Sequence, residues 1–414
     1  MATFHISSNI LAGLVVSIYI LGFAIGPLII APMSELYGRY LIYNVCNLTF
    51  IIFTVACALS TSIGMLIAFR VLAGMAGAAP LTIGGGTIAD IFPLQQRAAA
   101  MAIWSLGPLL GPVLGPIAGG FLVEAKGWRW VFWIIAIFAG AFSILFFFVG
   151  RETYHPTILA RKTARLRKET GNPNLRSKLD SDLPPKEVVI RSIVRPMKML
   201  FFSPIVLLMA IYVAINYGIM YLFFTTMTFV FEGQYHFSSG SVGLSYLGIG
   251  IGLMVGMGYV GRASDVYIKR AQAKGAATPE NRLELPLTVP GAVLLPIGVF
   301  IYGWTTDKHV HWIVPIIGTA FVGLGNLTGM MTIQTYLVDA FTVHAASAIA
   351  ANTVLRSVFG AFLPLAGLDM FDALGLGWGN SLLGFIALAM IPVPVFFRLR
   401  GERIRTNPRF QVQL

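Results

Sequence analysis

Two arginines lie inside long apolar stretches of this 414-residue sequence and are its most unusual ionisable side chains. Arg70 and Arg356 each have mostly apolar and small neighbours along the chain. Burying such a charge in hydrocarbon costs at least ~2.5 kcal/mol even on the most lenient scale. Something must offset that cost. A functional role is one interpretation of both residues, and a buried tie to helix-end carbonyls is the alternative for Arg356.

The other side chains offer no catalytic set. The chain has no glycine-rich phosphate-binding motif of the Walker type and no grouping of nucleophile, base and orienting residue. Its six histidines fall in predicted loops or near the ends of apolar stretches, so no metal site is predicted. We therefore expect no enzyme activity, no cofactor and no use of ATP.

The composition indicates that the apolar stretches around the two arginines are membrane spans. Hydrophobic residues make up 57% of the chain and charged residues only 11%, against roughly 25% charged in soluble domains. A soluble globular protein is excluded. Apolar runs of about 20 residues predict an all-α polytopic membrane protein. Eleven spans are predicted, at residues 10–32, 41–61, 63–89, 98–122, 128–150, 203–231, 240–262, 287–304, 312–338, 345–368 and 378–398.

The net charge of +12 then indicates orientation rather than nucleic-acid binding. Alternate predicted loops carry 24 Lys and Arg on one side and 3 on the other. Because cytoplasmic loops collect positive charge, the C-terminus and the central loop are predicted to be cytoplasmic.

The long hydrophilic segment 151–202 divides the chain. We expect an N-terminal half of five helices at 1–150, a basic cytoplasmic loop at 151–202, a C-terminal half of six helices at 203–398 and a cytoplasmic tail at 399–414. Residues 159–168 fit either a short helix on the anionic inner leaflet or a solvated charged linker.

Two short internal matches indicate that the halves are homologous. MSELYGRY at 33–40 resembles ASDVYIKR at 263–270, which pairs Ser34 with Ser264 and Arg39 with Lys269. Asp90-Ile-Phe similarly matches Asp339-Ala-Phe. The alignment leaves the sixth span without a partner, so one N-terminal helix is expected to be missing.

Several motifs together carry a family resemblance. GFAIGPLIIAPMSELYGRY (22–40), FRVLAGMAGAAP (69–80) and WSLGPLLGPVLGPIAGG (104–120) resemble signature motifs of the major facilitator superfamily. With WRWVFW (128–133), RETY (151–154) and IQTYLVDAF (333–341), the chain resembles the fungal drug:proton antiporters with twelve spans. The resemblance implies two pseudo-symmetric helical halves, here five plus six, and a proton gradient as the energy source.

The resemblance gives the loop charges a gating role. A tight turn can place a carboxylate at one helix end and a guanidinium against the next, so that ion pairs close one side of the membrane. Ordinary topology charge is the alternative reading. The residues concerned are Glu35, Gly38, Arg39, Asp90, Arg97, Asp265, Lys269 and Asp339.

The fourth span has glycine at every fourth position and proline after the first three glycines. Such a ladder lets another helix approach closely, while each proline removes a backbone donor. The family resemblance implies that this glycine- and proline-rich segment is a hinge typical of antiporters. Glycines that serve only close helix packing would give the same sequence pattern. The residues of this segment are Gly107, Pro108, Gly111, Pro112, Gly115, Pro116 and Gly119.

By the same resemblance, the third, sixth and ninth spans line the substrate path. They offer aromatic and neutral polar side chains, which suit a bulky, mostly apolar ligand. All seventeen carboxylates lie in loops or near span ends, which disfavours polyamines and metal ions. The expected cavity residues are Arg70, Asn216, Tyr217, Tyr221, Thr225, Asn326, Gln334 and Tyr336.

The sequence thus predicts a monomeric exporter of hydrophobic drugs, fungicides or secondary metabolites, driven by proton antiport. The plasma membrane is the expected location and the vacuolar membrane the alternative. Two other functions stay open: facilitated diffusion or uptake of a small organic nutrient, and a truncated, transport-inactive remnant.

Overall fold

The computed structural model describes residues 9–179, 184–273 and 278–407, and the elements it forms there are helical. The first group of helices is α1 (Asn9–Tyr37), α2 (Arg39–Ala58), α3 (Ile63–Gly77), α4 (Ala79–Ile91), α5 (Leu94–Lys126) and α6 (Trp128–Val149). Two helices follow in the central segment, α7 (His155–Thr170) and α8 (Pro185–Phe202).

The remaining helices are α9 (Pro204–Tyr235), α10 (Ser239–Ser245), α11 (Leu247–Ala273), α12 (Leu285–Asp307), α13 (Ile313–Phe341), α14 (Ala345–Phe362), α15 (Gly367–Met390) and α16 (Pro392–Thr406). Short 3₁₀ turns, η2 (Pro279–Leu283), η3 (Thr342–His344) and η4 (Leu363–Ala366), join some of them. The predicted all-α fold class is confirmed.

Ten segments of the described residues are long and apolar enough to cross a membrane. The last, Ala345–Thr406, contains both the tenth and the eleventh predicted spans. The predicted boundaries there were wrong. α14 ends at Phe362, before the turn that contains Pro364, and α15 already begins at Gly367 and bends at Gly375, whose φ is 76°. Proline and left-handed glycine set these limits because neither continues a regular helix.

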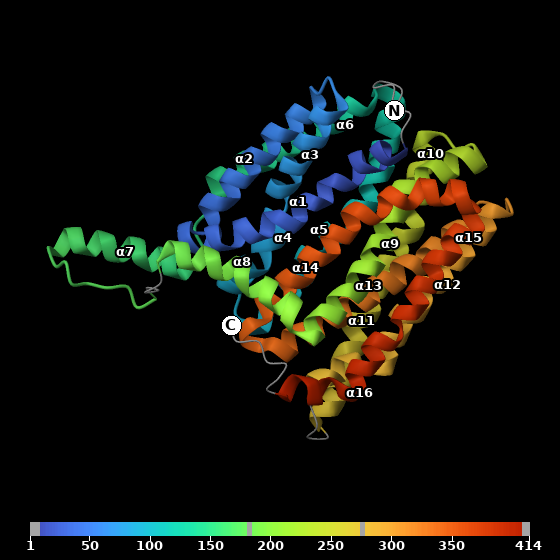
Figure 1. The fold of residues 1–414 in the computed structure, drawn as a ribbon. Coiled ribbons are helices and arrows are strands. Elements are labelled where there is room, and N and C mark those ends of the chain that lie inside the picture. The colour runs from blue at the N-terminus through green and yellow to red at the C-terminus, as the bar shows by residue number, and fades with distance from the viewer. Residues whose placement is uncertain (1–8, 180–183, 274–277, 408–414) are drawn as a thin grey trace. The chain divides into compact units, whose positions relative to one another are not determined.

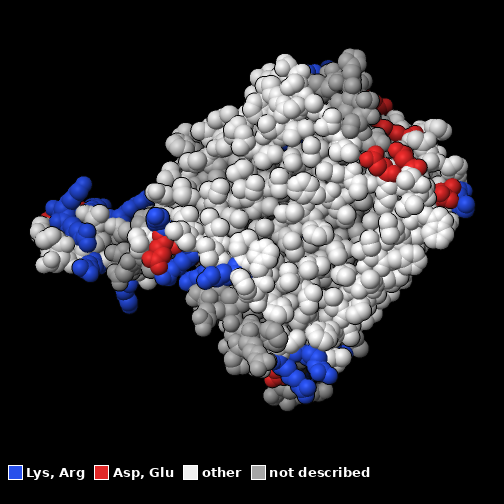
Figure 2. All heavy atoms as spheres, in the orientation of Figure 1, with Lys and Arg blue, Asp and Glu red and all other residues white. Residues whose placement is uncertain are grey.

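The central segment is more ordered than a simple linker. The basic run forms α7, in which no residue is buried, and Figure 1 shows α7 extending away from α1–α4. Gly171 follows it in the left-handed conformation, with φ 65°, as is common after a helix. Figure 2 shows Lys and Arg gathered on α7 and near α16, while most of the visible face is uncharged.

The chain divides into two compact units. Unit 1 comprises Met1–Leu21, Pro108–Val131 and Arg195–Leu414, and unit 2 comprises Gly22–Gly107 and Phe132–Val194. In unit 1, α13 packs against α11 and α12, α9 against α14, and α12 against α15. In unit 2, α2 packs against α3 and α4.

Glycines allow the closest helix contacts in unit 1. A Cβ atom added to Gly291 of α12 would lie 2.5 Å from the backbone nitrogen of Gly329 on α13. Without a hydrophobic driving force in lipid, such backbone proximity supplies the van der Waals contact that holds helices together.

The glycine ladder of α5 does not make contacts of this kind. Added Cβ atoms at Gly107, Gly111, Gly115 and Gly119 would meet no described atom within 4 Å. Helix α5 instead approaches α10 on another face, where a Cβ on Gly243 would lie 2.5 Å from the carbonyl oxygen of Pro116. Within unit 1, which contains Gly111, Gly115 and Gly119, no described helix therefore packs into the expected groove. Whether these residues and Pro108 and Pro112 act as a hinge stays a prediction.

This difference predicts opposite results for two matched glycine substitutions. Gly243→Ala should destabilise the protein by about 1–3 kcal/mol, because the methyl group would overlap backbone atoms that cannot move independently. Gly115→Ala should be neutral or stabilise by up to about 1 kcal/mol, because alanine favours helix and the site is open. Thermal unfolding of both purified variants in the same detergent measures this, and equal midpoints would contradict the packing described above.

Candidate functional site

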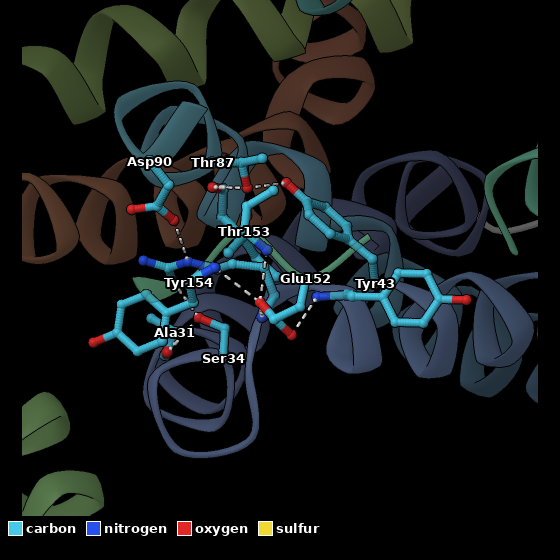
Figure 3. A network of polar contacts seen from close by, with 11 residues as sticks. Ala31, Ser34, Tyr43, Thr87, Asp90, Glu152, Thr153 and Tyr154 are labelled. Atoms are coloured by element: carbon cyan, nitrogen blue, oxygen red, sulfur yellow. Dashed lines mark hydrogen bonds and ion pairs between the residues drawn. The ribbon is translucent and has the colours of Figure 1, made fainter. Parts of the chain in front are cut away.

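A polar network that includes Ser34, Asp90 and Glu152 lies at the end of α1 and the start of α2 (Figure 3). Arg39 is at its centre. Its Nη1 donates to Ser34 Oγ at 2.6 Å, and its Nε lies 3.3 Å from Asp90 Oδ2. The side chains of Arg39 and Asp90 are only 13% and 16% exposed. Hydrogen bonds to charged groups contribute about 1.5–3 kcal/mol each when shielded in this way. The network joins α1, α2 and α4, and its gating role stays a prediction.

Glu152 completes the network from the segment after α6. Its Oε1 accepts hydrogen bonds from the backbone nitrogens of Arg39 (2.9 Å), Thr153 (3.0 Å) and Tyr154 (3.0 Å), and its Oε2 accepts from that of Tyr40 (3.3 Å). A carboxylate at the N-terminus of α2 is also favoured by the helix dipole. Sequence reasoning did not single out Glu152, although it stands in the RETY motif.

Glu152 also explains Gly38. This glycine has φ 95° and turns the chain between α1 and α2. A Cβ atom at that position would lie 2.7 Å from Cδ of Glu152. Only glycine combines the left-handed conformation with room for the carboxylate.

Tyr154 covers the guanidinium of Arg39. The ring centroid lies 4.6 Å from Cζ, a cation–π distance. Burial raises the pKa of the Tyr154 phenol, with the nearby carboxylates of Glu35 and Asp90 adding to the rise, so the ring stays neutral. Glu35 itself is exposed and is not a hydrogen-bond partner of Arg39. The side chain of Arg97 lies outside the described residues.

Unit 1 contains a matching network with a different cation from the one predicted. Arg282 Nε lies 2.7 Å from Asp339 Oδ2, and its Nη1 donates to Ser264 Oγ at 2.6 Å. The counterpart of Arg39 is therefore Arg282, whereas Lys269 is exposed on α11. The predicted pairing was wrong because the two loops differ in length. The side chain of Asp265 lies outside the described residues.

Two further ion pairs lie beside this network. Glu280 pairs with Arg405 at 3.3 Å, and Glu284 pairs with Arg398 at 2.9 Å. Here the two acids lie just before α12 and the two arginines lie on α16. Tyr336 is fully buried next to this group, in the core cluster around Met209 and Phe397. It shares this cluster with Tyr212 of α9, whereas Tyr221 and Phe224 pack against a different one.

One face of α9 carries a stripe of three aromatic side chains and one threonine, namely Tyr217, Tyr221, Phe224 and Thr228. Tyr246, between α10 and α11, packs against this stripe with its ring centroid 6.1 Å from that of Phe224. The rings of Tyr217 and Tyr221 are 4.7 Å apart, and those of Tyr221 and Phe224 are 5.4 Å apart. Thr228 Oγ1 lies 3.2 Å from the Tyr246 hydroxyl. The four α9 side chains are half-buried near the middle of a helix whose other residues are mostly buried.

Arg356 of α14 lies against this stripe. Its guanidinium carbon is 5.1 Å from the centroid of Tyr217, and its Nη1 is 3.5 Å from Sδ of Met330. Neither contact is with a helix-end carbonyl, so that interpretation of Arg356 is not supported by the described contacts.

The predicted neutral cavity residues have different surroundings. Asn326 Nδ2 donates to the carbonyl oxygen of Asn216 at 2.7 Å and thereby ties α13 to α9, with both residues buried. Thr225 is buried and donates to the carbonyl of Leu222 at 3.0 Å. Gln334 is half-buried on α13. The side chain of Asn326 thus links two helices and that of Thr225 bonds within α9, while Gln334 and the two tyrosines keep accessible surface.

Arg70 lies at the middle of α3 in unit 2. Its guanidinium carbon is 5.8 Å from the ring centroid of Phe132 on α6. As with Arg356, an aromatic face meets the charge within an apolar segment.

Comparison with known proteins agrees with the predicted family. The family model described as Major Facilitator Superfamily matches residues 1–364. The chain is 58% identical over 410 residues to MFS-type transporter penM of Penicillium rubens, covering 99% of this chain and 80% of that protein. It is 54% identical over 417 residues to efflux pump radE of Floropilus chiversii, covering 100% of this chain and 77% of that protein.

Solved structures share the fold at low identity. A D-xylose–proton symporter matches with a TM-score of 0.68 at 15% identity, covering 98% of this chain and 89% of its own. A POT family transporter in complex with a thioalcohol-conjugated peptide matches with a TM-score of 0.70 at 13% identity, covering 97% and 89%.

The four backbone hydrogen bonds of Glu152 make its charge testable. Glu152→Gln should destabilise the protein by about 1–3 kcal/mol, because an amide NH₂ would face backbone N–H donors. Glu169→Gln, which removes only the exposed pair with Arg165, should change stability by less than about 0.5 kcal/mol. Unfolding in one detergent compares them, and an unchanged Glu152→Gln protein would refute the capping role.

The corrected pairing predicts that Arg282, not Lys269, restrains the end of α13. Arg282→Ala should increase maleimide labelling of a cysteine introduced as Ala340→Cys, which is half-buried beside Asp339 on α13, severalfold relative to the same cysteine with Arg282 in place. Lys269→Ala should leave labelling unchanged, because the side chain is exposed. Equal labelling in both backgrounds would contradict the role of Arg282.

Proposed function

The chain belongs to the Major Facilitator Superfamily, and from this premise we propose that it exports bulky, mostly apolar small molecules in exchange for protons. It is a multi-pass membrane transporter and not an enzyme. Its substrates would be secondary metabolites, drugs or fungicides, and its location a fungal plasma membrane. Two groups of observations support the proposal.

The direction and substrate class are supported by a relative and by the side chains of α9. A relative that is 54% identical over the whole chain carries the name efflux pump. Half-buried Tyr217, Tyr221 and Phe224 near the middle of α9 are the observation on which the substrate class mainly depends. Aromatic faces with few polar groups bind large apolar molecules well.

The transport cycle would be alternating access by the two halves, residues 1–150 and 203–398, joined by the loop 151–202. The networks of Arg39 with Asp90 and of Arg282 with Asp339 would hold the cytoplasmic ends of their helices in one state and release them in the other. Each network is a small set of charged hydrogen bonds, which suits a contact that must be made and broken repeatedly.

Proton coupling would pass through Arg70, whose charge lies in the middle of an apolar helix. A titrating partner or substrate that meets this guanidinium would gain electrostatic stabilisation only in the state that exposes it. The glycine and proline residues of α5 support antiport through the family resemblance alone. A proton gradient needs no bound cofactor.

Antiport predicts that substrate movement depends on a pH gradient. Proteoliposomes loaded with the pH dye pyranine should report proton movement when cycloheximide or fluconazole is added, and nigericin should abolish gradient-driven accumulation of either drug. Drug accumulation that ignores the imposed gradient would refute antiport but leave export by another coupling ion.

Two substitutions test the proposed coupling and binding positions. Arg70→Ala should abolish gradient-driven export, and Tyr221→Ala should change the relative rates for the two drugs, without loss of protein from the membrane. Phe148→Ala is the control, because this ring is 79% exposed on α6. Normal export by both test variants would show that the positions assigned to coupling and binding are wrong.

A further inference from the structure

Arg356 is a cation with no acidic partner among the described residues. Its Nε is buried and has no hydrogen-bond partner there, and its Nη1 meets only the sulfur of Met330. The guanidinium faces the ring of Tyr217. A thioether is a weak acceptor, and an aromatic face offsets only part of a buried charge. The site therefore lacks an anion.

Among the described residues, the two helices that contact Arg356 carry carboxylates only near their ends, Glu232 in α9 and Asp339 in α13. Tyr217 lies near the middle of α9 and Met330 near the middle of α13. The carboxylates of the sequence lie in loops or near the ends of the predicted spans. A charge kept in the apolar interior without an internal partner indicates a ligand.

Asn352 provides a second, independent observation. It lies one helical turn before Arg356, so the two side chains share a face of α14. Asn352 is 0% exposed, and neither its Oδ1 nor its Nδ2 has a hydrogen-bond partner among the described residues. Buried polar atoms are nearly always satisfied, so an unsatisfied amide beside an unpaired guanidinium needs an explanation.

The surroundings are apolar and partly accessible. Gly360, one turn after Arg356, would place a Cβ atom 3.0 Å from the ring of Tyr217, so this face of α14 lies directly against α9. Tyr217, Tyr221, Phe224 and Met330 are half-buried, which leaves surface for a ligand along the stripe. A ligand with an acidic group could place that group at Arg356 and its aromatic or alicyclic body against the side chains of α9.

We propose that Arg356 and Asn352 bind the ionised acid of an amphiphilic organic monoanion, whose apolar body lies along Tyr217, Tyr221 and Phe224. The guanidinium offers paired N–H donors with the geometry of a carboxylate, and the Asn352 amide adds a donor. Since the site has one cation and an aromatic wall, it favours a monoanion with a large apolar body over a phosphate ester. The proposal rests on the export function and names its substrate class.

Two probes with the same aromatic body separate charge from hydrophobicity. Pyrenebutyrate is anionic at pH 7.4 and pyrenebutanol is neutral. Binding of each to the full chain in nanodiscs is measured by fluorescence, with empty nanodiscs subtracted. The unaltered protein should bind pyrenebutyrate at least about tenfold more tightly than pyrenebutanol, as a charged hydrogen bond predicts.

Substitutions test whether the preference for pyrenebutyrate arises at Arg356 and Asn352. Arg356→Gln should bring the ratio of the two affinities to about one, Arg356→Lys should retain part of it, and Asn352→Ala should lower it. Arg400→Gln, an exposed arginine on α16, should keep the full ratio. Unfolding midpoints establish that the variants fold.

The outcomes separate this inference from the proposed function. Equal affinities in the unaltered protein, absence of binding by either probe, or a preference that survives in Arg356→Gln would overturn the anion site. Gradient-driven flux of pyrenebutanol in proteoliposomes would still support proton-coupled export in those cases. Charge-selective binding without gradient-driven flux would uphold the site and refute antiport.

Discussion

A hydrocarbon environment gives polar groups no water to bond with, and most of this structure depends on that constraint. Backbone groups are satisfied within helices, and threonine hydroxyls return to their own helix, as Thr225 does to Leu222. The few polar side chains that cross between helices, such as Asn326 to the Asn216 carbonyl, meet a definite acceptor. Because hydrophobicity does not drive helix association in lipid, glycine contacts such as Gly291 with Gly329 take over that role.

The same constraint keeps charges near helix ends, where they can be paired. Arg39 with Asp90 and Arg282 with Asp339 form the same arrangement in the two homologous segments, each with a serine as second acceptor. Glu152 shows how one carboxylate can satisfy several backbone donors at once and begin a helix. These networks hold helices together without placing charge in the apolar interior.

Arg70 and Arg356 depart from this arrangement. Both lie within apolar helices, and the guanidinium of each lies near an aromatic ring. At Arg356 the ring offsets part of the cost of the charge and no described carboxylate pairs with the guanidinium, so this arginine keeps donors for a ligand. Buried polar groups without a hydrogen-bond partner are expected at functional positions, because a protein can lose some folding stability there and gain the ability to bind a ligand.

The sequence alone determined the all-α membrane fold, the family and the residues of the Arg39 loop, because composition, apolar runs and contiguous motifs are properties of one linear chain. Only the tertiary structure decided which charges meet. Asp339 pairs with Arg282, 57 residues before it, and α2 is capped by Glu152, 113 residues after Arg39. Folding also separated Tyr336 in the core from Tyr217 on an accessible face, although both are tyrosines in apolar helices. Such pairings arise from helix packing in space, which spacing along the chain does not encode.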